Sequence, residues 1–217
     1  MKTAKPVFDE LAILRERLNA DFSLGTEQRK LFRDDRIDEI LDMLIMAYVF
    51  GTEDADEELT VTETVVTDEM YAAVWKTIAD KNWEQRVREY FDDPNGTVDD
   101  IMRVVETDTN RIYNDAVLNV GEKTARKGTP VSKTWNTMLD DRVRMYHEML
   151  EGVTVPIDKK FHIDGDSARY PGDFVSPELN INCRCAITLN RAGTYGQRSL
   201  IKRERKTEYG EGQYGIH

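Results

Sequence analysis

The chain has 217 residues, 33% of them charged, and a formal net charge of −11. This length suffices for one large domain or two small ones with a buried core. No stretch reaches the roughly 20 apolar residues of a membrane-spanning helix, and the N-terminus lacks the apolar core of a signal peptide. We therefore expect a soluble protein with no membrane role. The acidic charge also disfavours general binding to duplex DNA, which needs a basic surface.

The charge is unevenly distributed. Residues 1–100 carry 12 Lys and Arg against 25 Asp and Glu, a net of −13, whereas residues 101–217 carry 18 against 16, a net of +2. The dense basic cluster near the C-terminus consists of Arg198, Lys202, Arg203, Arg205 and Lys206. We expect the tail to be flexible until it meets a partner. Its basic side chains are either solvated or in contact with nucleic acid or a partner.

The first half of the chain is predicted to be helical, because its apolar residues recur at three- and four-residue spacing. The predicted helices span residues 8–18, 28–50, 68–91, 98–105 and 109–126. Gly51 is expected to stop the second helix, and Thr97 to cap the fourth. The acidic run 53–58 lacks the spacing of an EF-hand and is predicted to be a solvated loop. Residues 59–67 alternate Val and Thr, which indicates either a strand or an extended linker.

Beyond residue 130 the pattern changes to short segments. Strands are predicted at residues 131–136, 152–157 and 183–189, and one helix at 141–150, with Asp140 or Asp141 as its cap. The fold class is therefore α+β, with an N-terminal helical arm followed by a small mixed helix and antiparallel-sheet domain. The predicted divisions are an acidic helical arm at 1–96, a compact domain at 97–190 and a basic flexible tail at 191–217.

Cys183 and Cys185 are separated by one residue, Arg184. This spacing is poorly compatible with a disulfide between them, which favours a reducing compartment. On a strand, alternate side chains share a face. The two sulfurs should therefore point the same way, with Arg184 opposite. A histidine from a neighbouring helix, His147 first and His162 second, would complete a set of three zinc ligands.

The fourth zinc ligand is left open between Asp141, Asp173 and water. Two buried thiols are also common as small core residues, and a lone buried histidine is often a hydrogen-bonded structural residue. The cysteine pair alone does not decide between a zinc site and a packed core.

The sequence shows no motif of a known catalytic site. It has no phosphate-binding loop, no zinc-protease helix and no G-x-S-x-G nucleophile elbow. A Cys–His nucleophile pair would lack an orienting group, and the adjacent Asp140 and Asp141 diverge on a helix. We expect a protein without catalytic residues.

Several short strings in the second half resemble one known family. They are Arg111-Ile-Tyr-Asn, Trp135, Asp140-Asp-Arg142-Val-Arg144-x-x-His147, Tyr170-Pro171-Gly172-Asp173 and Asn182-Cys183-Arg184-Cys185. In this order, over residues 100–189, they resemble the phage head morphogenesis domain of Mu F-like minor head proteins. The resemblance implies a structural signature made of Arg111, Trp135, Asp141, Arg142, Arg144, Pro171, Gly172, Asp173 and Asn182. It implies Trp135 as a core anchor and Arg142 and Arg144 as ion-pair or hydrogen-bond partners.

The resemblance also implies a function. Members are minor virion components, made in the host bacterial cytoplasm and placed inside the capsid at or near the portal, where they act in head assembly or in DNA packaging or ejection. The expected partners are the portal protein, the major capsid protein, or packaged DNA through the C-terminal tail. Some relatives carry toxin domains after this unit. The alternatives are an ADP-ribosyltransferase-like enzyme and a zinc-stabilised interaction module.

Overall fold

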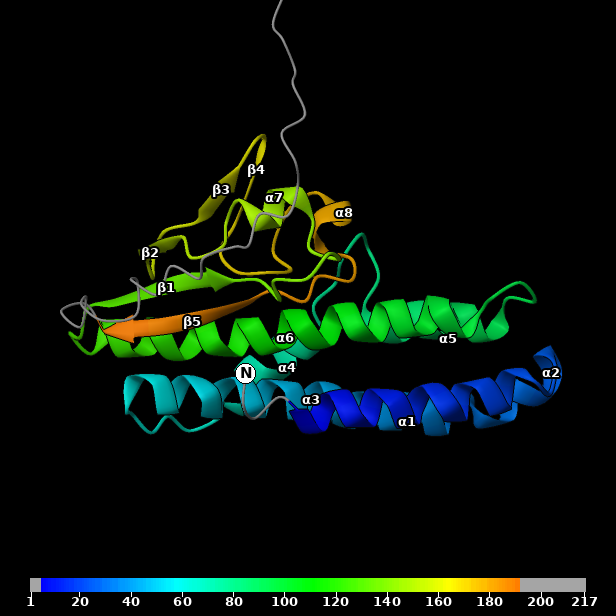
Figure 1. Ribbon diagram of the computed structural model, residues 1–217. Coiled ribbons are helices and arrows are strands. Elements are labelled where there is room, and N and C mark those ends of the chain that lie inside the picture. Colours follow the sequence, from blue (N-terminus) through cyan, green and yellow to red (C-terminus); the bar gives the residue numbers. More distant parts are fainter. Residues whose placement is uncertain (1–4, 192–217) are drawn as a thin grey trace, which may run out of the picture.

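The computed structural model describes residues 5–191 (Figure 1). The first part contains α1 (Lys5–Phe22), α2 (Thr26–Arg29), the 3-10 turn η1 (Lys30–Phe32) and α3 (Arg33–Leu59). It continues with α4 (Thr67–Val74), α5 (Trp83–Asp92) and α6 (Val98–Arg126). The second part contains β1 (Val131–Asn136), α7 (Met145–Glu148), β2 (Thr154–Pro156), β3 (Phe161–Ile163), β4 (Asp166–Ala168), α8 (Pro177–Asn180) and β5 (Ala186–Arg191). The α+β class is confirmed.

Helix α3 corrects two predictions, because Gly51 does not stop it and the acidic run 53–58 is helical. Glutamate is a good helix former, and Ala55 and Leu59, four residues apart on one face, are both fully buried. Packing of this face continues the helix through the charged residues. It ends at Thr60, which has a left-handed backbone with φ 50°. Residues 61–66 form no strand, so the linker alternative holds.

The predicted helix 68–91 is two helices, α4 and α5, separated by a turn. Ala79 and Asp80 both have positive φ there, and the backbones of Ile78 and Lys81 pair across the turn. Asn82 then starts α5 with a reciprocal capping box, because its side chain accepts from Gln85 N–H and the Gln85 side chain accepts from Asn82 N–H. The continuous apolar pattern hid this break, since the residues on both sides face the same core.

Helix α6 is continuous where two helices were predicted. Thr97 caps it as expected, with its hydroxyl accepting from the backbone N–H of Asp100. The polar stretch taken for a break is buried instead. Asp108 is fully buried and pairs with Arg111 at 2.9 Å and with Arg86 at 2.6 Å. These ion pairs let polar residues lie inside the protein without ending the helix.

The sheet has strand order β2–β1–β5, all antiparallel, and β3 and β4 form a separate hairpin. The first predicted strand is confirmed at both ends, and Trp135 on it lies opposite Ile187. The predicted strand 183–189 begins later, at Ala186, and the predicted helix 141–150 is reduced to the single turn of α7. Asp140 and Asp141 are not its cap, because the residue before α7 is Arg144.

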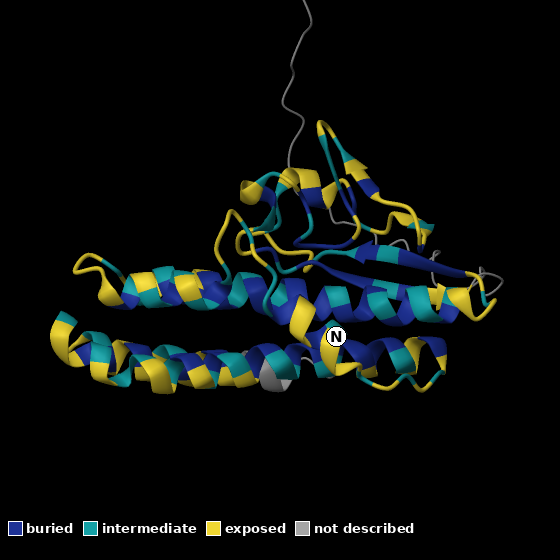
Figure 2. Ribbon diagram, turned by 180° about the vertical axis from the view of Figure 1, so that it is seen from behind, coloured by how far each residue is buried: buried dark blue, intermediate teal, exposed yellow. Residues whose placement is uncertain are grey.

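Helix α6 is the centre of the molecule. It packs against α1 and α3 on one side and against β1 and β5 on the other (Figures 1 and 2). The buried apolar residues of both parts form one contiguous cluster. The boundary proposed at residue 97 coincides with the cap of α6, a helix that belongs to both layers. Within residues 5–191, no helix combines the length and apolar character needed to cross a membrane.

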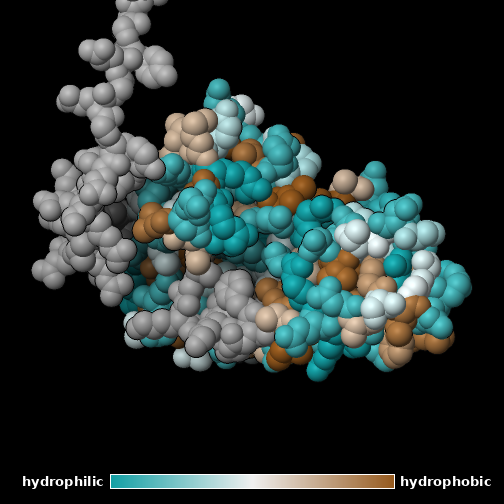
Figure 3. Space-filling view, turned by 45° about the vertical axis from the view of Figure 1, so that its right-hand side comes forward, coloured by the Kyte–Doolittle hydropathy of each residue, from teal (hydrophilic) through white to brown (hydrophobic). Residues whose placement is uncertain are grey.

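The face seen in Figure 3 is mostly hydrophilic, with hydrophobic side chains breaking through in places. Exposed apolar residues occur around α7, where Leu139, Met145 and Met149 are each more than half exposed.

Candidate metal centre

His147, Cys183 and Cys185 come together in the fold. His147 lies on α7, and the two cysteines lie in the turn that leads into β5. The Nδ1 atom of His147 is 3.6 Å from Cys183 Sγ and 3.5 Å from Cys185 Sγ. The three donor atoms lie within 4.8 Å of one another, and all three residues are buried. Within residues 5–191, no other group of three or more His, Cys, Asp or Glu side chains is placed to hold a metal ion.

The backbone that carries the cysteines differs from the prediction. They do not lie on a strand, because Asn182 has a left-handed φ of 54° and Cys183 N–H closes a turn onto the carbonyl of Asn180. Both sulfurs nevertheless face the same histidine. Arg184 donates two hydrogen bonds of 2.7 Å to Asp140 and does not contact the histidine.

Aromatic side chains enclose the histidine. The ring of Trp135 meets the ring of His147 edge-on at 5.5 Å, and Phe174 stacks on it at 5.7 Å. Trp135 is fully buried, in agreement with its expected role as a core anchor. These contacts fix the imidazole plane, so its Nδ1 edge is directed at the sulfurs.

Two polar contacts hold the cysteine turn from the outside. The side chain of Asn114, on α6, donates to the carbonyl of Cys185 at 3.2 Å and accepts from Ile187 N–H at 2.9 Å. The guanidinium of Arg144 donates to the carbonyl of Ile181. The hydrogen bonds tie the turn to both the central helix and the α7 segment.

The two thiols are electrostatically coupled. Hydrogen bonding with Cys185 lowers the pKa of Cys183, and the nearby charges of Arg144 and Arg184 add to this. The same bond, together with burial, raises the pKa of Cys185. The two thiols therefore differ in acidity, and a metal ion that binds them displaces their protons.

A small cavity of about 10 Å³ lies against the three donors, between them and Met138, Arg142 and Asn182. That is room for about one water-sized species. The Nε2 atom of His147 has no hydrogen-bond partner among the described residues. Both cysteines are free thiols. The cluster can thus bind a metal ion, or remain as a hydrogen-bonded part of the core.

The other predicted ligands do not join the cluster in the described residues. Asp141 is exposed. Asp173 is engaged elsewhere, where it interacts with Lys76 at 3.4 Å and accepts from the backbone N–H of Arg169 at 3.1 Å. His162 is exposed on the β3–β4 hairpin.

Several signature residues pack together away from the cluster. Arg111 is buried on α6, where it pairs with Asp108 and donates to the carbonyl of Ala73 at 3.0 Å. The buried turn Pro171–Gly172 lies over it. Gly172 has φ +97°, and a Cβ there would come 3.0 Å from the Arg111 Cβ. A larger side chain would be excluded both by the backbone conformation and by this contact.

Arg142 and Asn182 border the small cavity beside the cluster. The side chain of Arg142 is exposed at the mouth of the small cavity. Asn182 donates its backbone N–H to the hydroxyl of Thr107 at 3.0 Å. The basic cluster of Arg198, Lys202, Arg203, Arg205 and Lys206 lies outside the described residues.

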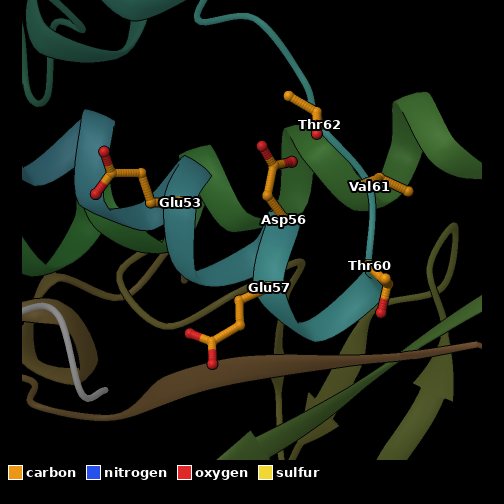
Figure 4. A pocket seen from close by; sticks show the side chains of 6 residues that line it. All are labelled: Glu53, Asp56, Glu57, Thr60, Val61 and Thr62. Atoms are coloured by element: carbon orange, nitrogen blue, oxygen red, sulfur yellow. The ribbon is translucent and has the colours of Figure 1, made fainter.

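The acidic run at the end of α3 lines an open depression of about 580 Å³ (Figure 4). The carboxylate of Glu57 points away from those of Glu53 and Asp56. These acids do not form a ligand group within 5–191. Glu53 and Glu57 are exposed as expected, but Asp54 is buried and accepts from the hydroxyl of Tyr113 at 2.6 Å, so the run is only partly a solvated surface.

Sequence reasoning missed Asn114 and Phe174 as residues that shape the centre. Asn114 carried a signal, because a polar residue on the apolar face of a predicted helix needs a partner inside the protein. Phe174 had none, since nothing local indicates that it would stack on His147.

Fold and centre together define a small α+β unit in which Arg111, Trp135, Pro171 and Gly172 are packed in the core and His147, Cys183 and Cys185 form a buried cluster. Comparison with known protein families gives one match. The profile described as phage Mu protein F-like protein matches residues 60–188, so the chain belongs to this family of phage head proteins. The match begins well before residue 100 and includes α4 and α5.

One curated relative is an NAD(+)–arginine ADP-ribosyltransferase, EFV, of Enterococcus faecalis (strain ATCC 700802 / V583). It is 30% identical over 84 residues, which cover 39% of this chain and 17% of the enzyme. The chain thus spans only a small part of that relative. No solved structure matches the chain.

Proposed function

We propose that this protein is a minor structural component of a tailed-phage virion, located inside the capsid at or near the portal. The observation that carries the proposal is the family match over residues 60–188. The signature residues support a structural role, because Arg111, Trp135 and Gly172 are buried in packing contacts. None of these three residues lines the small cavity at the metal centre or the acidic depression of α3.

The charge distribution favours a protein partner for the helical arm. Packaged DNA repels a surface with the net charge of residues 1–100, whereas a basic protein surface attracts it. Asp35 and Asp38 are exposed on α3 and suit such a contact. The basic tail is suited to DNA or to the portal lumen.

Binding to the portal protein of the same phage tests this proposal. We expect co-purification of the full chain with portal oligomers and additional cryo-EM density at the portal. The double variant Asp35→Lys/Asp38→Lys should weaken binding at least tenfold, whereas Lys159→Glu/Lys160→Glu, exposed on the opposite layer, should not. Absence of portal binding by the folded wild-type chain would refute the portal location, and equal binding by both variants would refute the arm contact.

DNA contact by the tail has its own test. Removal of residues 192–217 should abolish salt-dependent retention of the protein on DNA. Retention unchanged by this truncation would exclude the tail as the DNA contact.

We further propose that the metal of the His/Cys/Cys cluster is zinc, and that it stabilises the fold. Tetrahedral zinc with Zn–S bonds of about 2.3 Å and Zn–N bonds of about 2.05 Å places nitrogen and sulfur roughly 3.6 Å apart. The observed separations of 3.6 and 3.5 Å agree with this value. In the described residues the protein supplies three ligands, and we propose water as the fourth.

Metal analysis of the purified chain tests the zinc proposal. We expect one zinc per chain, retained by His162→Ala and lost in His147→Ala and Cys183→Ser. A ligand at 1,000 times its Kd stabilises by about 4 kcal/mol. Chelation should therefore lower Tm by roughly 8–16 °C for a chain of this size. If the purified protein contains no metal, and neither zinc nor chelator changes its Tm, the packed-core alternative is established.

ADP-ribosyl transfer is a second candidate, favoured by the match to the Enterococcus faecalis enzyme. The match covers 17% of that enzyme, so it gives little support for transfer of the activity. Incubation with labelled NAD⁺ and arginine-rich protein distinguishes the two. We expect neither transfer nor hydrolysis, and either reaction would establish an enzyme.

A further inference from the structure

A second cavity lies between α1, α6 and the cysteine turn. Its volume is about 360 Å³, which falls within the range of pockets that bind small ligands. Leu11, Ala47 and Met102 contribute apolar walls. It adjoins the small metal-site cavity, since Cys183 borders both.

Two buried polar atoms in its lining have no partner in the described structure. They are the hydroxyl of Thr109, a residue only 6% exposed, and the side-chain amide nitrogen of Asn110. A buried polar group without a hydrogen bond costs about 1–3 kcal/mol. Both residues line the cavity, so a ligand that brings hydrogen-bond acceptors into this otherwise apolar space can satisfy these donors after a side-chain rotation.

The charged residues of the lining favour an anionic acceptor. Arg15 interacts with Asp99 at 2.5 Å, and with Glu106, the lining carboxylate, at 3.5 Å. Arg184 is held by the carboxylate of Asp140. The guanidinium of Arg142 has no hydrogen bond or short ion pair to a described residue, although Asp140 lies near enough to interact electrostatically. It is thus the lining cation available to a ligand.

We propose that this pocket binds an apolar carboxylate, with the hydrocarbon part against Leu11 and Met102 and the carboxylate near Thr109, Asn110 and Arg142. The same chemistry occurs in a fatty acid and in the C-terminal residue of a partner polypeptide. The inference rests on the pocket alone and does not depend on the virion role.

Isothermal titration of the full chain with defined probes tests the pocket. The probes are octanoate and N-acetyl-leucyl-leucine, with octanol and the amidated dipeptide as neutral counterparts. We expect saturable binding of at least one carboxylate, at least tenfold tighter than its neutral counterpart. Preference for octanoate identifies a free acyl chain as the ligand type, and preference for the dipeptide identifies a polypeptide terminus.

Variants connect binding to the named residues. Arg142→Gln and Thr109→Val should each weaken carboxylate binding, the first about tenfold, whereas Arg126→Gln and Thr124→Val should not. Thr124 is a good control because its hydroxyl is also buried and unpaired on α6, outside the pocket.

Ala12 lies at the exposed edge of the cavity, so Ala12→Trp should block it, with Ala20→Trp on the same helix as its control. Melting curves verify that each variant is folded. Wild type that binds neither carboxylate at millimolar concentration, or neutral probes that bind equally well, would overturn the inference. Binding unaffected by a folded Ala12→Trp variant would do so too.

Discussion

Replacement of Gly51 by alanine tests the contact between the two longest helices. Gly51 lies in the middle of α3, and a Cβ there would come 2.4 Å from the backbone carbonyl oxygen of Tyr113 and 3.0 Å from the Cβ of Ala116, both on α6. Backbone atoms of a packed helix cannot move aside as the end of a side chain can. The helices must therefore separate or tilt to admit one methyl group.

Two opposing terms set the size of the effect. Alanine is favoured over glycine within a helix by about 1 kcal/mol. Overpacking of a well-filled core costs about 1–3 kcal/mol, and contact with backbone places Gly51 at the upper end of this range. We expect Gly51→Ala to lower the free energy of unfolding by about 2 kcal/mol, and Tm by roughly 4–8 °C.

Gly121→Ala provides the matched control. Gly121 is also buried on a helix, but its added Cβ would meet the side-chain ends of Ile157 at 2.7 Å and Leu189 at 3.1 Å. These methyl groups can rotate, so we expect a change within about 1 kcal/mol of wild type. Urea unfolding followed by circular dichroism measures both. A Gly51→Ala variant as stable as wild type, or less affected than Gly121→Ala, would refute the close-approach argument.

Three further predictions concern buried polar groups and a helix cap. Arg111→Met leaves Asp108 with one cationic partner and should cost about 3–5 kcal/mol, measured by urea unfolding; a loss below 1 kcal/mol would contradict the ion-pair account. Burial lowers the pKa of Lys133 to about 8, so the unfolded chain binds the extra proton between pH 8 and the usual pKa near 10.5. Stability should therefore rise over that window in wild type relative to Lys133→Met; a constant difference across pH 7–10 would show that burial does not lower the pKa of Lys133. Thr97→Ala removes the cap of α6 and should cost about 1 kcal/mol, whereas Thr62→Ala in the linker should change stability by less than 0.5 kcal/mol.

The candidate site was predictable to the extent that it depended on residue type. Cysteine and histidine are the side chains that zinc prefers, so Cys183, Cys185 and His147 could be grouped before their positions were known. The fourth ligand could not be predicted, because it depends on where Asp141 and Asp173 lie. Asp173 forms an ion pair with Lys76, which lies on a distant segment of the chain. No local pattern contains that information.

The sequence by itself determined the helical first half, the change to short strands after residue 130, strand β1 and the cap at Thr97. Each depends on periodicity or on side chains within a few residues, and these interactions are local. Tertiary structure decided the continuity of α6 through Asp108, the extension of α3 past Gly51 and the break before Asn82. In each case the local preference is worth only about 1 kcal/mol, and burial against another element exceeds it. The convergence of His147 with the cysteines is likewise a tertiary outcome, since Trp135, Phe174 and Asn114 position these residues from separate parts of the chain.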